Sequence, residues 1–148
     1  MSDQMRIAIC GSISMWDALI KIKEDLESKG HTVGFPEAAT NIALTGRESH
    51  SERADDKIKN DFIRKHYRVI TEHDAILVVN KDKGHIKNYI GGNTFLEMGF
   101  AYILNKKIYC LHPLPDMLYS SELIAMRPII LNGNLSILDE PASKTEQE

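Results

Sequence analysis

The chain has 148 residues, which is enough for one domain with its own hydrophobic core. It is 43% hydrophobic and 26% charged, as globular proteins are. Its formal net charge of -3 does not indicate a basic surface that would bind nucleic acid. The longest apolar runs, residues 75–79 and 128–131, are too short to cross a bilayer, and the polar residues 1–5 give no sign of a signal peptide. We therefore expect a globular cytoplasmic protein that binds neither nucleic acid nor a membrane.

The first quarter of the chain has the pattern of a strand, a helix and a second strand. Residues 6–10 are an apolar run that ends in Gly11-Ser12, which predicts a strand followed by a tight turn. In residues 14–29 the apolar side chains recur at steps of three and four, which predicts an amphipathic helix. A glycine, the commonest left-handed C-cap, follows it. Residues 31–35 predict the second strand.

The middle of the chain alternates between polar and strongly apolar segments. Residues 37–52 are polar without a firm period and predict a mobile loop. Residues 53–72 carry apolar side chains along one side, which predicts a long second helix. Residues 75–79 are unbroken and rich in β-branched side chains, the pattern of a strand that is covered on both faces. Residues 81–92 predict another loop.

The last third of the chain continues the alternation. The elements predicted here are a helix at residues 93–105, a strand at 107–111, a short helix at 120–126 and a strand at 128–131. Residues 1–139 are therefore expected to form the domain, and residues 140–148 a frayed tail.

Strands that alternate with helices predict a single α/β domain. We expect it to be doubly wound and flavodoxin- or Rossmann-like, with a five-stranded parallel sheet and helices on both faces. Ligands of such sheets bind beyond the carboxyl ends of the strands. Three segments should meet there: Gly11-Ser12 after the first strand, Asn80 onward after the third, and the glycine-rich entry to the third helix.

That helix entry, Gly-Gly-Asn-Thr-Phe-Leu-Glu at residues 91–97, carries the strongest chemical signal. Paired glycines allow the backbone to approach a ligand closely, and the start of a helix favours an anion or a polar sugar. Glu97, one turn into the helix, should stay ionised at neutral pH, as a nucleophile requires. The expected ligand contacts are Gly91, Gly92, Asn93 and Thr94.

Three features also have plainer interpretations. Thr94-x-x-Glu97 fits a capping box, in which the glutamate only bonds back to the helix start. Gly11-Ser12 can be no more than a turn. The two cysteines, Cys10 and Cys110, end apolar runs and match no metal spacing, so we expect reduced, buried thiols, with no metal and no cofactor.

Several segments together resemble the nucleoside 2-deoxyribosyltransferase superfamily, which includes the 2′-deoxynucleoside 5′-phosphate N-hydrolases. They are residues 74–80, 91–102 and 107–111, supported by the opening Ile-Cys-Gly-Ser-Ile at residues 9–13. The likeness extends over residues 6–131. Its most specific part is the Glu-x-Gly-x-Ala run that begins at Glu97.

The resemblance implies cleavage or base exchange at the N-glycosidic bond of a deoxynucleoside or its 5′-monophosphate. In the family a glutamate attacks C1′ and forms a covalent glycosyl-enzyme, which a second base or water resolves; on this match Glu97 is the nucleophile. The logic is that of retaining glycosidases. The family also uses the region of Ser121 to reach a neighbouring subunit's pocket, which implies at least a homodimer.

Two positions depart from the family pattern. Relatives carry an aspartate eight residues before the aspartate that opens the third strand; here that strand opens at Asp74 and the earlier position is His66. His66 could replace the aspartate in acid–base work, or it could be a half-buried helix residue without a chemical role. Gly91 stands where relatives have an Asp or Ser that holds the sugar or phosphate, and Asn93 and Thr94 could take over that contact.

Two competing hypotheses follow from these departures and from the motif. The Gly-Gly-x-Thr-x-x-Glu sequence also resembles the motif of the lysine-decarboxylase-like phosphoribohydrolases, although the proline of that motif and one residue of its spacing are missing. Such an enzyme would release bases from ribonucleotides. Alternatively, the changes at His66 and Gly91 indicate a nucleotide-binding or sensor module without catalysis.

Overall fold

The structure is a computed structural model that describes residues 5–36 and 61–139. The loop predicted at residues 37–52 and the tail predicted at residues 140–148 lie outside the described residues. So does the first part of the second predicted helix.

The core of the fold is a parallel sheet of five strands. In chain order these are β1 (Arg6–Gly11), β2 (Thr32–Gly34), β3 (Ala75–Val79), β4 (Lys107–Cys110) and β5 (Ile129–Ile130). Every pairing is parallel, and the order across the sheet is β2-β1-β3-β4-β5. The chain therefore adds β2 on one side of β1 and then crosses to place β3 on the other side. The doubly wound five-stranded sheet predicted from the sequence is confirmed.

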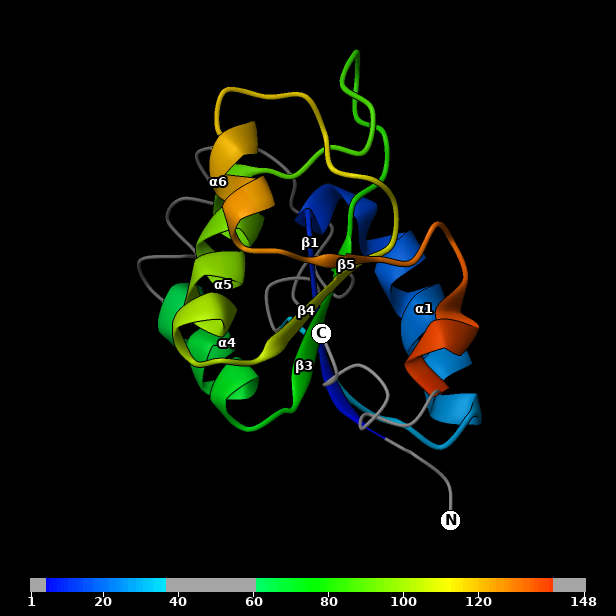
Figure 1. Cartoon of the computed structure of the whole chain (residues 1–148). Coiled ribbons are helices and arrows are strands. Elements are labelled where there is room, and N and C mark those ends of the chain that lie inside the picture. Colours follow the sequence, from blue (N-terminus) through cyan, green and yellow to red (C-terminus); the bar gives the residue numbers. More distant parts are fainter. Residues whose placement is uncertain (1–4, 37–60, 140–148) are drawn as a thin grey trace.

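Helices cover both faces of this sheet, as Figure 1 shows. The helix α1 (Trp16–Ser28), which follows the 3-10 turn η1 (Ile13–Met15), packs on one face together with the 3-10 turn η2 (Leu135–Asp139). The helices α4 (Phe62–Thr71), α5 (Gly92–Ile103) and α6 (Ser120–Ala125) cover the other face. Among the described residues, no helix is long and apolar enough to span a bilayer.

The alternation of side chains along β1 decides which residues meet which helices. Ile7 and Ile9 belong to the core on the α1 side, whereas Ala8 and Cys10 belong to the core on the side of α4, α5 and α6. Successive side chains of a strand point to opposite faces, which explains this division. Cys10, the last buried residue of β1, is therefore directed at the helices that follow β2 and β3.

The helix boundaries differ from the prediction by one or two residues at most ends, and by more at the start of α4. The helix predicted over residues 53–72 does not run continuously, because Asp61 has a left-handed backbone conformation (φ 54°) and α4 begins at Phe62. A left-handed residue cannot continue a right-handed helix. The helix predicted at residues 93–105 begins one residue earlier, at Gly92, and ends at Ile103.

Candidate active site

A cleft of about 330 Å³ opens at the carboxyl edge of the sheet. Its walls come from two segments that are distant in sequence, the turn after β1 and the approach to α5. The lining residues are Gly11, Ser12, Ile13, Ser14, Lys83, Tyr89, Gly91, Gly92, Asn93, Thr94 and Leu96. The strand order reverses between β1 and β3, and a cleft beyond that point is where doubly wound sheets bind ligands. Six of the predicted contact residues, Gly11, Ser12 and residues 91–94, thus lie together.

The first turn of α5 forms one wall of this cleft. Gly91 is the N-cap, and the first helical hydrogen bond runs from the Phe95 N–H to the Gly91 carbonyl, at 2.8 Å. The N–H groups of Gly92, Asn93 and Thr94 precede that bond, so they belong to the positive end of the helix. A wall of this kind favours an anion or a polar sugar.

The loop before α5 is held by aromatic contacts. A Cβ atom at Gly91 would lie 2.9 Å from the Tyr89 hydroxyl, so glycine allows the Tyr89 ring to lie against the helix start. The Tyr119 hydroxyl donates to the carbonyl of Ile90, and the Tyr119 ring stacks on Phe95 with centroids 4.4 Å apart. The residues at the start of α5 are therefore held by contacts with Tyr89 and with Tyr119.

The capping-box interpretation of Thr94-x-x-Glu97 is wrong. Gly91 is the N-cap, which makes Thr94 the third residue of the helix and Glu97 the sixth. Glu97 accepts a hydrogen bond at its Oε2 from the Asn93 side-chain amide, at 3.2 Å. Its carboxylate is thus oriented by a side chain one turn earlier on the same helix face.

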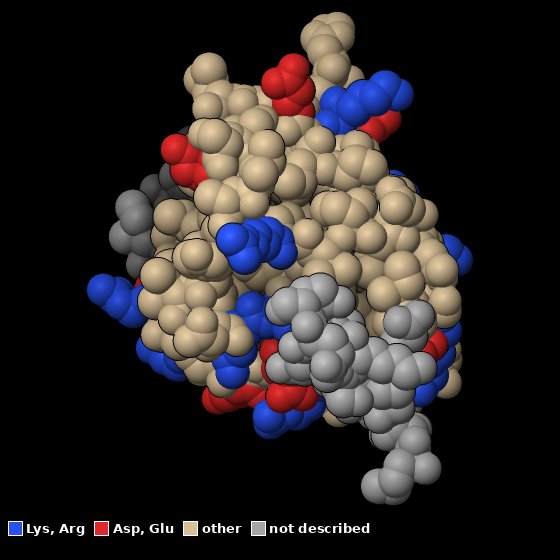
Figure 2. All heavy atoms as spheres, in the orientation of Figure 1, with Lys and Arg blue, Asp and Glu red and all other residues tan. Residues whose placement is uncertain are grey.

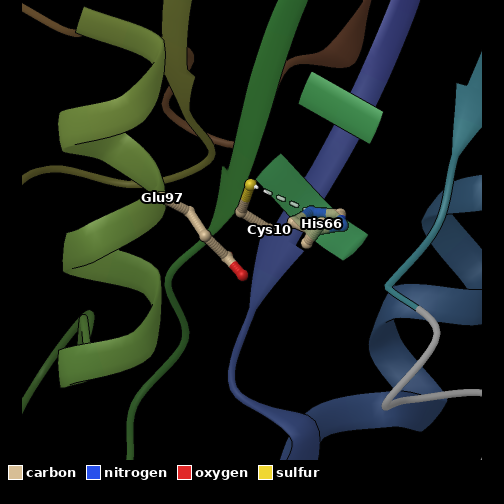
Figure 3. Close-up of side chains that lie close together, drawn as sticks. All are labelled: Cys10, His66 and Glu97. Carbon is tan, nitrogen blue, oxygen red and sulfur yellow. Dashed lines mark hydrogen bonds between the residues drawn. The ribbon is translucent and has the colours of Figure 1, made fainter. Parts of the chain in front are cut away.

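Glu97 is not among the residues that line the cleft, although Asn93, Thr94 and Leu96 of the same helix are. Its exposed fraction is only 5%. Figure 3 shows its side chain extending from α5 toward β1, with the carboxyl group directed toward the end where β1 and β3 finish. Cys10 and His66 lie beside it, and one ligand-type atom from each of the three residues lies within 4.8 Å of the others.

His66 is buried, with 4% of its surface exposed, on α4. Its Nε2 lies 3.0 Å from the carbonyl oxygen of Ile9 and 3.5 Å from Cys10 Sγ. A carbonyl oxygen can only accept, so Nε2 carries the hydrogen and Nδ1 the lone pair. Among the described residues Nδ1 has no hydrogen-bond partner. Burial lowers the pKa of His66 to about 4, so the ring is neutral at pH 7.

The buried position of His66 argues against its predicted acid–base role. The residue does not line the cleft, and a neutral ring that donates to the backbone of β1 is poorly placed to protonate a leaving base. Its contacts favour a role in positioning Cys10, which in turn lies beside Glu97.

The same three side chains are of the types that bind Zn²⁺. Binding would require a lone pair on the histidine nitrogen that faces the sulfur. That nitrogen, Nε2, donates to Ile9, so it has no lone pair to offer in this arrangement. The geometry therefore describes a hydrogen-bonded cluster rather than a metal centre.

Two predicted contact residues lie outside the cleft lining. Asn80 is fully buried; its amide donates to the carbonyls of His112 and Pro113, and its oxygen accepts from the His112 N–H. It therefore holds the segment after β4 against the end of β3. Ser121 is exposed on α6 and donates to Glu122. Their contact with a ligand stays a prediction.

Sequence reasoning did not single out four residues that the structure brings to the site. Ser14, Lys83 and Tyr89 line the cleft, and Cys10 lies beside Glu97. Lys83 and Tyr89 carried no motif, because loop positions have no period. Cys10 did carry a signal, since alternation along β1 already separates its face from that of Ile9, but only the topology shows that α5 covers that face.

The chain matches no model of a known protein family, and no curated protein sequence matches it. Among solved structures, it is similar to the 2-deoxyribosyltransferase of the psychrotolerant bacterium Bacillus psychrosaccharolyticus, an enzyme described as a biocatalyst for nucleoside synthesis. The likeness covers 92% of this chain and 97% of that chain, with a TM-score of 0.53 and 18% sequence identity. The chain thus has the α/β fold of that transferase.

The buried histidine predicts a pH dependence of stability. The reference pKa of histidine is 6.5, whereas that of His66 in the fold is about 4. Between these values the unfolded chain takes up a proton that the folded chain does not. We expect the contribution of neutral His66 to be complete above pH 6.5 and to fall by up to about 3 kcal/mol on acidification to pH 4.

Urea unfolding at a series of pH values measures this loss. In His66→Gln, whose amide can still donate to Ile9, the free energy of unfolding should fall less over the same range. His85→Gln, which alters an exposed histidine, should behave like the wild type. Equal losses in the wild type and His66→Gln would show that His66 is not responsible.

Proposed function

We propose that the protein cleaves the N-glycosidic bond of a deoxynucleoside or a deoxynucleoside 5′-monophosphate, with Glu97 as the nucleophile. The observation that carries this proposal is the position of Glu97. A buried carboxylate accepts a hydrogen bond from Asn93, which lines the cleft, and it lies on the helix whose first turn forms one wall of that cleft at the switch point of the sheet. The fold shared with a 2-deoxyribosyltransferase and the resemblance in the Glu-x-Gly-x-Ala run at Glu97 support the same reaction.

The chemistry follows from the carboxylate. One oxygen of Glu97 attacks C1′ while the bond from C1′ to the base nitrogen breaks. The base leaves with the bonding electron pair and takes up a proton from water in the cleft. The negative charge stabilises the oxocarbenium-like transition state, as in retaining glycosidases. Water then releases the sugar, or a second base accepts it. Burial of Glu97 strengthens this effect, because little water screens its charge.

The cleft also suits a phosphorylated substrate. Its volume of about 330 Å³ lies in the range of small-molecule sites. The first turn of α5, the two hydroxyl-bearing residues Ser12 and Ser14, and the cationic residue Lys83 all contribute to its lining. Backbone N–H groups at a helix start together with a lysine are a common way to bind phosphate. We therefore favour the 5′-monophosphate over the free nucleoside.

A binding or sensor function without catalysis is the second candidate. The observation in its favour is that His66 is neutral and buried and so cannot replace the aspartate that handles the proton of the leaving base in the family. Calorimetry would then detect nucleotide binding while no base appears over many hours.

Replacing the nucleophile should abolish base release. Glu97→Gln keeps the size of the side chain and the bond from Asn93 but removes the charge, so we expect kcat to fall by about a thousand-fold or more. Chromatography of free base from a panel of deoxynucleosides, deoxynucleotides and ribonucleotides measures the loss. Release from ribonucleotides alone would favour a phosphoribohydrolase.

Glu24→Gln is the matched control, because it removes an exposed carboxylate from α1, on the opposite face of the sheet from α5 and α6. It should leave the rate unchanged. If the wild type releases base and Glu97→Gln releases it equally fast, Glu97 is not the nucleophile.

Lys83 should distinguish phosphorylated from free substrates. In Lys83→Ala we expect kcat/KM for a deoxynucleoside 5′-monophosphate to fall about ten- to a hundred-fold, the effect of one charge-assisted hydrogen bond. The value for the free nucleoside should change little. Lys87→Ala, in the same loop but away from the cleft lining, serves as control. Equal losses for both substrates would argue against a phosphate contact.

We also propose that the protein is a homodimer or a larger homo-oligomer that associates through α5 and α6. The helix α5 is apolar on its outer side as well as its inner side: Met98 is buried, while Leu96 and Ile103 are 47% and 77% exposed. A helix that is apolar all round is normally covered. An apolar groove of about 540 Å³ lies between α5 and α6, and few charged groups interrupt the surface over α6 in Figure 2.

Ile103→Glu tests this association. A carboxylate placed in the covered groove would be desolvated, so we expect the variant to sediment as a monomer at micromolar concentration where the wild type sediments as a dimer or larger species. Lys21→Glu, on α1 at the opposite face of the sheet, should leave the assembly unchanged. A monomeric wild type would contradict the proposal.

A further inference from the structure

Close contacts between buried polar side chains lead from the backbone of β1 to Glu97. They begin at His66, whose Nε2–H lies 3.0 Å from the Ile9 carbonyl and 3.5 Å from Cys10 Sγ. One N–H thus serves two acceptors, the carbonyl oxygen and the sulfur. Because the sulfur accepts from His66, the hydrogen of the thiol remains available for donation to another group.

Glu97 is the acceptor beside that thiol. Cys10 Sγ and a carboxylate oxygen of Glu97 lie within 4.8 Å of each other. A side-chain hydrogen bond with Glu97 is among the causes that raise the pKa of Cys10, after burial and the Glu97 charge. Cys10 is fully buried, so its thiol stays protonated and presents a donor to the carboxylate.

We propose that Cys10 is a positioning residue of the site: its S–H donates to the Glu97 carboxylate, and His66 fixes the direction of that donation. Asn93 holds the carboxylate from α5, at Oε2. With donors on two sides, from β1 and from α5, the carboxyl group is fixed in the orientation toward the carboxyl edge that Figure 3 shows. The catalytic consequence rests on the proposed function, whereas the hydrogen bond itself does not.

An ion pair of thiolate and imidazolium is the main chemical alternative for Cys10 and His66. It would place three charges together in a buried cluster, beside the Glu97 carboxylate. Burial disfavours this ion pair, because burial raises the pKa of the Cys10 thiol and lowers the pKa of the His66 imidazole. The neutral pair is the state that the contacts describe.

Among the described residues, the other titratable groups on the elements near this cluster are Cys110 on β4, which lies in the same core as Cys10, and Lys83 and Tyr89, which line the cleft. Burial alone raises the pKa of Cys110 to about 12. Cys110 is therefore a matched control: a second buried thiol on a neighbouring strand, without a contact to Glu97 in the cluster.

The S–H stretching band in the infrared reports the hydrogen bond directly. The chain has two cysteines, so Cys10→Ala and Cys110→Ala assign both bands. We expect the Cys10 band at the lower frequency, and Glu97→Gln, which makes the acceptor neutral, should raise that band alone. A Cys10 band that does not respond to Glu97→Gln, or stoichiometric zinc in the purified wild type, would overturn the assignment.

The pH profile of base release tests the catalytic consequence. Losing one donor should raise the apparent pKa of the acid limb of kcat by roughly half to one pH unit in Cys10→Ala, with KM little changed. Cys10→Ser, which keeps a donor, should restore the wild-type limb, and Cys110→Ala should not move it. An unshifted limb in Cys10→Ala would contradict the positioning role. If the wild type releases no base at all, the proposed function fails, and the infrared result still decides whether the hydrogen bond exists.

Discussion

The parallel pairing of β1 with β3 is the constraint on which the site depends. The two strands pair over five residues, from Ile7 with Ala75 to Gly11 with Val79, and every residue of β3 is buried. Parallel strands end at the same edge, so the turn after β1 and the loop after β3 leave the sheet side by side. Because β2 lies on the other side of β1, the exits of β1 and β3 are neighbours at this edge of the sheet. The cleft and the start of α5 lie there.

The same pairing explains why Glu97 is buried and yet close to the cleft. Alternation along β1 directs Cys10 at the face that α4 and α5 cover, and Glu97 approaches that residue from α5. Removing a carboxylate from water costs free energy unless donors replace the water. Asn93 supplies one such donor, and the thiol of Cys10 supplies the second in our proposal. A polar cluster in an apolar core stabilises the fold less than hydrocarbon packing, so its presence is better explained by chemistry than by stability.

Much of this arrangement could be predicted from the sequence, for reasons that differ between elements. The unbroken run of β3 and the spacing of apolar residues in α1 predict the parallel sheet and its helical cover, because both patterns follow directly from burial. Gly91 to Thr94 could be placed at the cleft because helix starts after parallel strands meet at one edge. The break at Asp61 could not be predicted, since a left-handed residue leaves no period in the sequence. The contacts of His66 could not be predicted either: they depend on which helix covers which half of the sheet, and that is a property of the topology.

The central claim is that Glu97 forms a bond to C1′ of a sugar. Mass spectrometry of peptides from protein that is rapidly denatured during turnover of a deoxynucleoside 5′-monophosphate tests it most directly. We expect the peptide containing Glu97 to gain the mass of the 5-phospho-deoxyribosyl group, and the gain to disappear when that glutamate is replaced by glutamine. A sugar adduct on a different residue, or base release with inversion at C1′ and no adduct on any peptide, would contradict it.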